Sequence, residues 1–463
     1  MYDCSREFNK FYRKYVVLPA VKQNELRDKR KLNINRLKDG LIEYNDDNNK
    51  DYKISEERVQ GSMAMHTTTQ SDEYDYDIDV GIVFESDNLN DLGPLATRNV
   101  VANAIERKTR QFAENPEVKT SCVRLKYTSG YHVDFATFKR HKGYFEDEYT
   151  YEHAGKEWSV RGIKALEEWF NEQIKNQGND NLRKVIRLSK MFCKSRPSWV
   201  NMPSGLVQTV LCAEKMQTNY ERLDEIFYYT MKEIVNRLHS YFEVTAPVDN
   251  GRMLVTRESD YQKMKNWESH LSKMIDDLDI LFDDECTYED ALNAWAIFFD
   301  HPYWKELSSS SSEENRSINK TYDFNDTEEY IDDKYSIYEQ YDVTIDCKVA
   351  GNGFSQMPIL SYLDGLGMRS RKFIPRNFSI KCKISNTNCP SYDKVLWKVL
   401  NVGPEAERRN DIRGQIAERG NEITENSNFF GNHYIECYLI KNDVCVAIGH
   451  VDVPIGGSEI DRG

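Results

Sequence analysis

The sequence holds 463 residues, of which 39% are hydrophobic and 30% are charged, as in an ordinary globular protein of two or three domains. Its formal net charge of −14 argues against a protein that binds duplex DNA through bulk electrostatic attraction. No apolar run reaches the ~18 residues that a membrane span needs, and the N-terminus lacks the apolar stretch of a signal peptide. The ten cysteines form no Cys-x-x-Cys pair, so we expect reduced thiols in a cytoplasmic protein.

The N-terminal part mixes helical and strand patterns. Residues 5–45 carry apolar side chains at helical spacing, and Pro19 breaks this helix or starts a second one. A strand is predicted at 77–85 and a helix at 97–114. Two β runs joined by a Thr-Ser-Gly turn follow, and they cover 118–127 and 131–140.

The second half changes from a helical to a β-rich pattern. The helical pattern runs from Pro197 to about residue 305. A serine run within "ELSSSSSEENRSINK" cannot bury apolar area, which predicts a flexible linker. Short alternating runs beyond it predict a separate β-rich domain. We therefore expect an α+β protein with a mixed core at 1–180, a helical domain at 181–306, the linker at 307–322 and the β-rich domain at 323–463.

Aspartates occupy alternate positions at the start of the strand predicted at 77–85. In a strand, residues i and i+2 point to the same face, so Asp77 and Asp79 project together while Ile78 points into a core. Two unpaired carboxylates side by side repel each other, and a divalent cation would neutralise them. Mg²⁺ takes oxygen ligands, usually one or two carboxylates together with substrate phosphates. Asp75 and Asp77 would also share a face, but apolar neighbours favour the pair Asp77 and Asp79.

Asp134 supplies a third carboxylate, as a lone acid within the alternating apolar strand "GYHVDFATF". Three such carboxylates can hold two metal ions about 3.5–4 Å apart for nucleotidyl transfer. Gly61 and Ser62 precede this strand pair and would offer backbone N–H groups and a hydroxyl to phosphate oxygens. Each feature alone has a plain structural explanation: a loop, an edge or turn, or an edge-strand charge. Their combination predicts a metal-dependent nucleotidyltransferase.

Residues 1–305 resemble the polymerase-β-like nucleotidyltransferases and, more closely, the cGAS/DncV-like enzymes of bacterial anti-phage defence, including their SMODS-type branch. The words that carry the resemblance are "QGSMAMHT", "YDIDVGIVF", "GYHVDFATF", "GKEWSV…ALEEWF", "LRKVIRLSKMFC" and "MPSG". It implies a polymerase-β-like fold in which the first helix is a long spine behind the active site. It also implies two Mg²⁺ ions, or Mn²⁺ in their place, held by the catalytic residues Asp77, Asp79 and Asp134. Gly61 and Ser62 would bind the nucleotide.

The same resemblance places Lys190 and Ser204 at the triphosphate of the donor nucleotide. Lys190 belongs to a basic stripe on the predicted helix "NLRKVIRLSKMFCKS", whose members are Arg183, Arg187, Lys190 and Lys194. Ser204 is equally well explained as the N-cap of the next helix.

Residues 325–456 resemble the adenylyl/guanylyl and SMODS C-terminal sensor domain. The resemblance rests on "VLWKVLNVGPEAERRNDIRGQI", "NFFGNHYIECYLI" and "VAIGHVDVPIG". In a ligand pocket, Trp397 would stack on a base, and Arg408, Arg409 and Arg413 would clamp phosphates. The alternative is a core tryptophan, with arginines that pair with the acidic residues around them.

The expected enzyme joins nucleoside triphosphates, with ATP or dATP as the expected donor, and releases pyrophosphate without using a template. The resemblance implies a cyclic or linear oligonucleotide messenger that controls a separate, membrane-associated, pore-forming effector in anti-phage defence. One rival is a transferase that modifies RNA or protein; an RNA substrate would favour a longer basic groove than residues 183–194 supply. The other rival is a non-catalytic nucleotide sensor. Three carboxylates that bind no metal would be energetically costly, so their presence argues against this rival.

Overall fold

The computed structural model describes residues 1–71, 75–144, 147–310, 328–351, 353–364, 373–401, 413–428 and 430–456. The chain separates into two compact units, Met1–Arg316 and Ser317–Gly463. The first unit combines a mixed sheet with many helices, and the second is β-rich, which confirms the expected α+β class. No helix in the described ranges is long and apolar enough to span a membrane.

A mixed seven-stranded sheet forms the base of the first unit. Its central strand β2 (Asp77–Glu85) runs parallel to β5 (His132–His141), and β1 and β4 flank this pair in antiparallel orientation. Alternate apolar residues of β2 are fully buried, so this strand forms at the predicted position. The remaining strands are β1 (Ile54–Val59), β3 (Glu117–Val118), β4 (Val123–Lys126), β6 (Thr150–Ala154) and β7 (Trp158–Val160).

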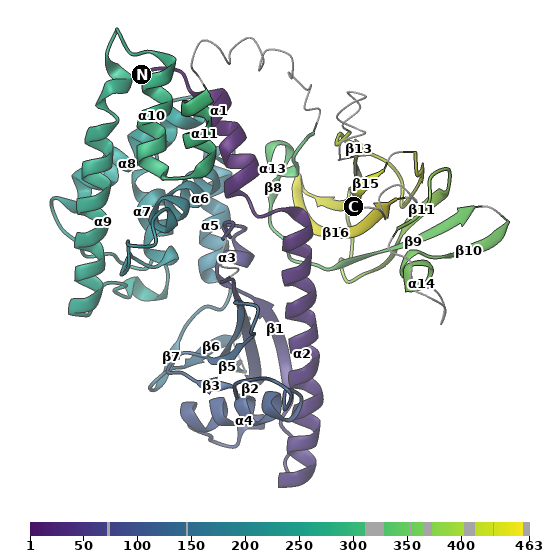
Figure 1. Ribbon diagram of the computed structural model, residues 1–463. Helices are drawn as coiled ribbons and strands as arrows, with labels where there is room; N and C mark the ends of the chain where they lie inside the picture. The colour runs from purple at the N-terminus through teal and green to yellow at the C-terminus, as the bar shows by residue number, and fades with distance from the viewer. Residues whose placement is uncertain are drawn as a thin grey trace. The chain divides into compact units, whose positions relative to one another are not determined.

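The N-terminal helical stretch is divided into three pieces. These are α1 (Ser5–Phe11), a π-helical turn (Tyr12–Val16) and the long helix α2 (Ala20–Asn48). Pro19 adopts an extended conformation at the start of α2, so it begins the second helix. Helix α2 lies along the sheet and packs on α4 (Pro94–Arg107), as Figure 1 shows. A Cβ atom on Gly40 would lie 1.8 Å from the carbonyl oxygen of Ala104, so only glycine permits this close packing.

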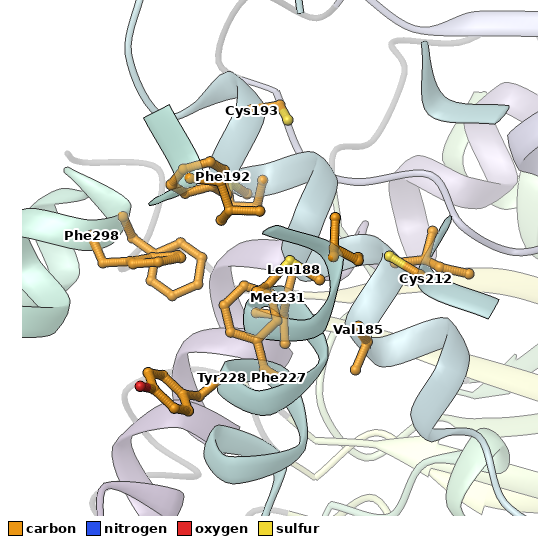
Figure 2. Packing of buried hydrophobic residues seen from close by; sticks show 14 of the residues in the cluster. Val185, Leu188, Phe192, Cys193, Cys212, Phe227, Tyr228, Met231 and Phe298 are labelled. Carbon is orange, nitrogen blue, oxygen red and sulfur yellow. The ribbon is translucent and has the colours of Figure 1, made fainter. Parts of the chain in front are cut away.

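A helical bundle completes the first unit, and α1 belongs to it (Figure 1). Its other members are α5 (Ala165–Gln177), α6 (Asn181–Lys194), α7 (Gly205–Lys215), α8 (Leu223–Leu238), α9 (Glu258–Asp277), α10 (Tyr288–Phe299) and α11 (Pro302–Ser310). Figure 2 shows Leu188 and Phe192 of α6 within the same apolar cluster as Phe227 of α8 and Phe298 of α10. This buried face fixes α6, which carries Lys190, in the middle of the bundle.

The second unit contains two antiparallel sheets with short helices between strands. The strands are β8 (Ser336–Ile337), β9 (Val343–Gly351), β10 (Phe354–Pro358), β11 (Ser379–Thr387), β12 (Lys394–Leu400), β13 (Ile416–Glu418), β14 (Glu422–Asn426), β15 (Gly431–Lys441) and β16 (Val444–Ile455), and the helices are α13 (Ile331–Lys334) and α14 (Ile359–Asp364). The four-stranded sheet has the order β10-β9-β11-β14, and the five-stranded sheet, which includes the parallel strand β8, has the order β13-β12-β15-β16-β8. Side chains from both sheets form one core cluster.

The structure bears on the predicted linker and on the predicted state of the cysteines. Residues 307–310 of the predicted linker are the end of α11, and residues 311–322 lie outside the described residues. The expectation of reduced thiols is wrong for Cys347 and Cys382, which form a disulfide. These two residues are direct partners across β9 and β11, although 35 residues separate them in the chain. The pairing depends on strand register, so cysteine spacing alone did not predict it.

Candidate active site

Three carboxylates meet at one end of the β2–β5 strand pair. In the parallel register, Asp79 lies opposite Asp134, and Asp77 lies opposite His132. Because these residues are neighbours at alternate positions, the structure brings Asp77, Asp79 and Asp134 to one face of the sheet. Asp75 precedes the strand; its carboxylate accepts a hydrogen bond of 2.5 Å from the Ser71 hydroxyl and faces Lys194 at 3.6 Å.

Gly61 lies directly against this carboxylate cluster. It begins the short helix α3 (Gly61–Ala64) with a φ of +63°, a conformation that side chains with a Cβ rarely adopt. A Cβ atom at this position would lie 2.0 Å from Oδ2 of Asp79, so the close approach also requires glycine. The hydroxyl of the next residue, Ser62, accepts a hydrogen bond of 3.0 Å from Thr68.

The three carboxylates have different electrostatic surroundings. Burial, together with the charges of Asp77 and Asp134, raises the pKa of Asp79 to about 7. Burial also acts to raise the pKa of Asp77, but the hydrogen bond and charge of His132 and the charge of Arg124 outweigh it and lower that pKa. Asp79 is therefore the carboxylate whose charge the surrounding protein compensates least, as expected where a cation would bind.

Arg124 pairs with the third carboxylate. Its Nε donates to Oδ1 of Asp134 at 2.7 Å, and its Nη2 donates to Oδ2 at 2.6 Å. Over the described part of the chain, no group of three or more acidic, histidine or cysteine side chains is arranged to hold a metal ion. The three aligned carboxylates are nonetheless the oxygen ligands that Mg²⁺ prefers. The donor atoms of these carboxylates are therefore of the type that the expected metal takes, and Arg124 occupies those of Asp134.

A pocket of about 530 Å³ opens beside the carboxylates, between the sheet and the helical bundle. This volume suits a ligand of the size of a nucleotide. From the sheet side the lining includes Gly61, Ser62, Asp75, Tyr76, Asp77 and Asp79, and from the bundle it includes Leu166, Lys190, Lys194, Trp199, Gly205 and Gln208.

Lys190 faces the carboxylates from α6. Its Nζ donates to the backbone oxygen of Thr67 at 3.1 Å and to the Thr67 hydroxyl at 2.8 Å. Burial, reinforced by the charges of Arg187 and Lys194, lowers the pKa of Lys190 to about 7. An anionic ligand in the pocket would favour the charged form of this lysine.

The structure does not place all the residues predicted beside Lys190 in the pocket. Ser204 is the N-cap of α7, and its hydroxyl accepts a 3.4 Å hydrogen bond from the backbone N–H of Val207. The pocket lining includes Gly205 rather than Ser204, so the structure shows the capping role alone. The basic stripe is also corrected, because Arg183 and Arg187 are buried. Lys190 and Lys194 are its members that reach the pocket.

In the second unit, the structure does not support the predicted role of Trp397 in a ligand pocket. Trp397 is 1% exposed, and its indole N–H donates to the backbone oxygen of Gly420 at 2.9 Å. Because its ring packs within the core, no face is free to stack on a base, and the alternative of a core tryptophan is correct. The backbone of Arg413 pairs with that of Asn401, and Arg408 and Arg409 lie outside the described residues.

Sequence reasoning missed four residues that belong to this site: Thr67, Arg124, His132 and Trp199. His132 stands two residues before Asp134 in "HVD", so strand periodicity could have shown that these two side chains share a face. Arg124, in "VRLK", is the partner of Asp134 on the neighbouring strand. Thr67 and Trp199 lie in connections between elements, and only the folding of the chain brings them to the pocket.

Two segments of the chain match models of known protein families. Residues 56–138 match the nucleotidyltransferase domain of the DncV-like cyclic GMP-AMP synthases, and residues 325–456 match the adenylyl/guanylyl and SMODS C-terminal sensor domain. A cyclic GMP-AMP synthase from Escherichia albertii is 23% identical over 414 residues, which are 85% of this chain and 83% of that protein.

Two solved structures of Vibrio cholerae DncV have a similar fold. Its 3′-deoxy ATP bound form is 16% identical with a TM-score of 0.50, and covers 62% of this chain and 91% of that one. Its complex with GTP and 5MTHFGLU2 is 15% identical with a TM-score of 0.50, and covers 63% and 93%. The two domain matches and the relative together identify a DncV-like nucleotidyltransferase domain at residues 56–138, where the aligned carboxylates lie, and a C-terminal sensor domain at residues 325–456.

Proposed function

We propose that this enzyme joins nucleoside triphosphates into an oligonucleotide messenger, cyclic or linear, without a template. The observation that carries the proposal is the pocket in which Asp77 and Asp79 face Lys190, with Asp134 in register beside Asp79. Carboxylates from the sheet and a half-buried lysine from the bundle suit a metal-bound triphosphate. We propose ATP or dATP as the donor nucleotide and the cytoplasm as the site of action.

Each part of the pocket has a role in the proposed reaction. Asp77, Asp79 and Asp134 would hold two Mg²⁺ ions, or Mn²⁺ in their place, and these ions would neutralise charge at the triphosphate and promote ionisation of the acceptor hydroxyl. Lys190 binds the negative phosphates, and the N-terminus of α3 at Gly61 and Ser62 presents its N–H groups and hydroxyl to them. Ser204 would act on the same phosphates through the N-terminus of α7, which it caps.

The chemistry is a displacement at the α-phosphorus of the donor. The oxygen of an acceptor hydroxyl forms a bond to this phosphorus, the bond to the bridging oxygen of the β-phosphate breaks, and pyrophosphate leaves. The hydroxyl proton passes to water. Lys190 helps to hold the leaving pyrophosphate, because its ammonium group lines the same pocket as the carboxylates.

The proposed biological role is supported by the relative and by the match of the second unit. Because the relative is a cyclic GMP-AMP synthase, we propose that the product is a signalling nucleotide. We further propose that it controls a separate, membrane-associated, pore-forming effector during anti-phage defence, and that the C-terminal sensor domain regulates synthesis.

The direct test is incubation of the purified chain with each NTP and dNTP in Mg²⁺ or Mn²⁺, followed by phosphatase treatment and mass spectrometry. We expect pyrophosphate release and a phosphatase-resistant cyclic product or an oligomeric ladder. Asp79→Asn should abolish the product, because it removes a central carboxylate. Asp75→Asn is the matched control: it changes an acid that also lines the pocket but precedes the strand, and it should retain activity. Loss in Asp75→Asn with activity in Asp79→Asn would contradict the proposed site.

The rival with a macromolecular acceptor is tested in the same reactions. Adding total RNA and carrier protein with radiolabelled donor would place label on the macromolecule if the enzyme modifies RNA or protein. The buried positions of Arg183 and Arg187 leave a short basic surface at the pocket, which does not favour a long RNA. We therefore expect the label in small products.

A further inference from the structure

Arg124 lies within the carboxylate cluster, although the proposed reaction gives it no part. It stands on β4 as the direct partner of Asp134 on β5, so both side chains project from the same face of the sheet. The guanidinium takes both oxygens of Asp134, at 2.7 Å and 2.6 Å. Its Nη2 also lies 3.4 Å from Oδ1 of Asp77, so one cation contacts two of the three carboxylates.

The pair is sheltered from water and well aligned. The side chain of Asp134 is 10% exposed and that of Arg124 is 22% exposed. Two parallel N–H···O bonds to a largely buried carboxylate are stronger than an exposed ion pair. Arg124 is therefore the cation that pairs with Asp134 and is shared with Asp77, which also contacts His132.

The geometry of Arg124 differs from that of a purely structural arginine in the same sheet. Arg140, at the far end of β5, pairs with Glu85 and Glu56 away from the pocket. Arg124 instead occupies the carboxylate oxygens that a metal ion would need. Two cations cannot hold the same oxygens at once, so binding of the metal and the Arg124–Asp134 pair oppose each other.

We infer that Arg124 is a built-in cation that competes with divalent metal for the third carboxylate and so sets the metal concentration at which the site fills. This inference rests on the proposed function, because it takes the three aspartates as metal ligands. Without metal, Arg124 stabilises carboxylates that would otherwise repel each other. When metal binds to all three carboxylates, the guanidinium leaves Asp134. Arg124 thus takes no part in the reaction itself. It determines how readily the three carboxylates bind metal.

Metal binding without nucleotide tests this inference apart from turnover. Mn²⁺ is titrated into the full chain by calorimetry, with bound ion counted by electron paramagnetic resonance. Arg124→Leu should tighten Mn²⁺ binding by on the order of tenfold, the scale on which a neighbouring charge changes proton affinity. Arg124→Lys keeps the charge but loses the bidentate geometry, so its affinity should lie between the two. Arg140→Leu, the matched control on the same strand as Asp134, should bind Mn²⁺ as the unmodified chain does.

Thermal melting supplies the second readout. Metal-free Arg124→Leu should melt at a lower temperature than the unmodified chain. Saturating Mn²⁺ should raise the melting temperature of this variant by more than it raises that of the unmodified chain, because the metal replaces the lost cation. Equal or weaker Mn²⁺ binding in a folded Arg124→Leu would overturn the inference while leaving the proposed metal site intact. Absence of Mn²⁺ binding in all variants would overturn the proposed metal site and this inference with it. If Arg124→Leu does not fold, the intermediate affinity of Arg124→Lys decides the question in the same way.

Discussion

At the scale of single residues, Gly61 shows how one position joins backbone conformation to the site. Its positive φ and its contact with Asp79 come from the same sharp turn between β1 and α3. A Cβ here would push against a carboxylate that lies between two others. The requirement for glycine therefore belongs to the geometry of the site as well as to the turn.

Gly61→Ala should abolish nucleotide transfer and lower the free energy of unfolding by more than the ~1–2 kcal/mol that a left-handed alanine costs. The reason is the added contact with Asp79. Gly178→Ala is the control, because Gly178 has a similar φ of +69° but open space around the new Cβ. It should show the backbone cost alone and keep full activity. Denaturant unfolding and product yield measure both effects, and equal losses in the two variants would contradict the steric argument.

Lys190 gives a prediction about pH. Its pKa of about 7 means that the free protein loses this charge as pH rises through neutrality. A triphosphate prefers the charged form, so binding should take up a proton, and affinity for a non-hydrolysable ATP analogue should fall between pH 7 and 9. Lys190→Met should weaken binding by roughly 10–100-fold at pH 7, as expected for a lost charged hydrogen bond.

Calorimetry in two buffers of different ionisation enthalpy measures this proton uptake. Lys194→Met, at the exposed rim of the same pocket, serves as the comparison. It removes a charge that helps to lower the pKa of Lys190, so the fall in affinity should persist but move to higher pH. A pH-independent affinity in the unmodified chain would exclude Lys190 from the phosphate contact.

At the scale of elements, the β15–β16 pair carries a charged cluster within the second unit. His450 has a side chain that is 1% exposed; its Nε2 lies 3.0 Å from Asp452, and its Nδ1 lies 3.5 Å from Glu436. Glu436 also accepts a 2.6 Å hydrogen bond from Tyr438. Burial alone would lower the pKa of His450, but the hydrogen bonds and charges of Asp452 and Glu436 raise it to about 9.

The stability of the second unit should therefore depend on pH. Because the pKa of His450 is higher in the folded chain than its ordinary value of 6.5, its contribution is complete below pH 6.5 and is lost as pH rises through 9. We expect the free energy of unfolding to fall by roughly 1–3 kcal/mol over this window. His450→Gln should flatten the dependence, whereas His239→Gln, in the first unit, should not. Calorimetric scans from pH 6 to 9.5 measure it, and an unchanged slope in His450→Gln would contradict the assignment.

At the scale of the whole molecule, the chain consists of two units with separate cores. A protease site introduced after Ser312 should, once cleaved, leave two folded fragments, each melting cooperatively near the temperature of its transition in the intact chain. The reason is that each unit buries its own apolar side chains. Calorimetry before and after cleavage checks this, and loss of either transition would show that the units depend on each other for stability. Comparing messenger synthesis before and after cleavage then tests whether the second unit regulates the first.

The placement of the carboxylates on their strands could be predicted from the sequence because strand periodicity is short-ranged. Alternation of apolar and acidic residues placed Asp77 and Asp79 on one face, and the lone acid in "GYHVDFATF" marked Asp134. The β-rich character of the second unit followed in the same way from its alternating runs. The α+β class could be predicted because each element carries its own pattern of burial.

Only the tertiary structure decided which strands are neighbours and in which register they pair. The opposition of Asp79 to Asp134, the pairing of Arg124 with Asp134 and the disulfide between Cys347 and Cys382 all depend on contacts between separate strands. The burial of Arg183 and Trp397 depends on packing from distant elements. A sequence determines such contacts only through the complete fold, because they depend on alignments between distant segments rather than on local period or composition.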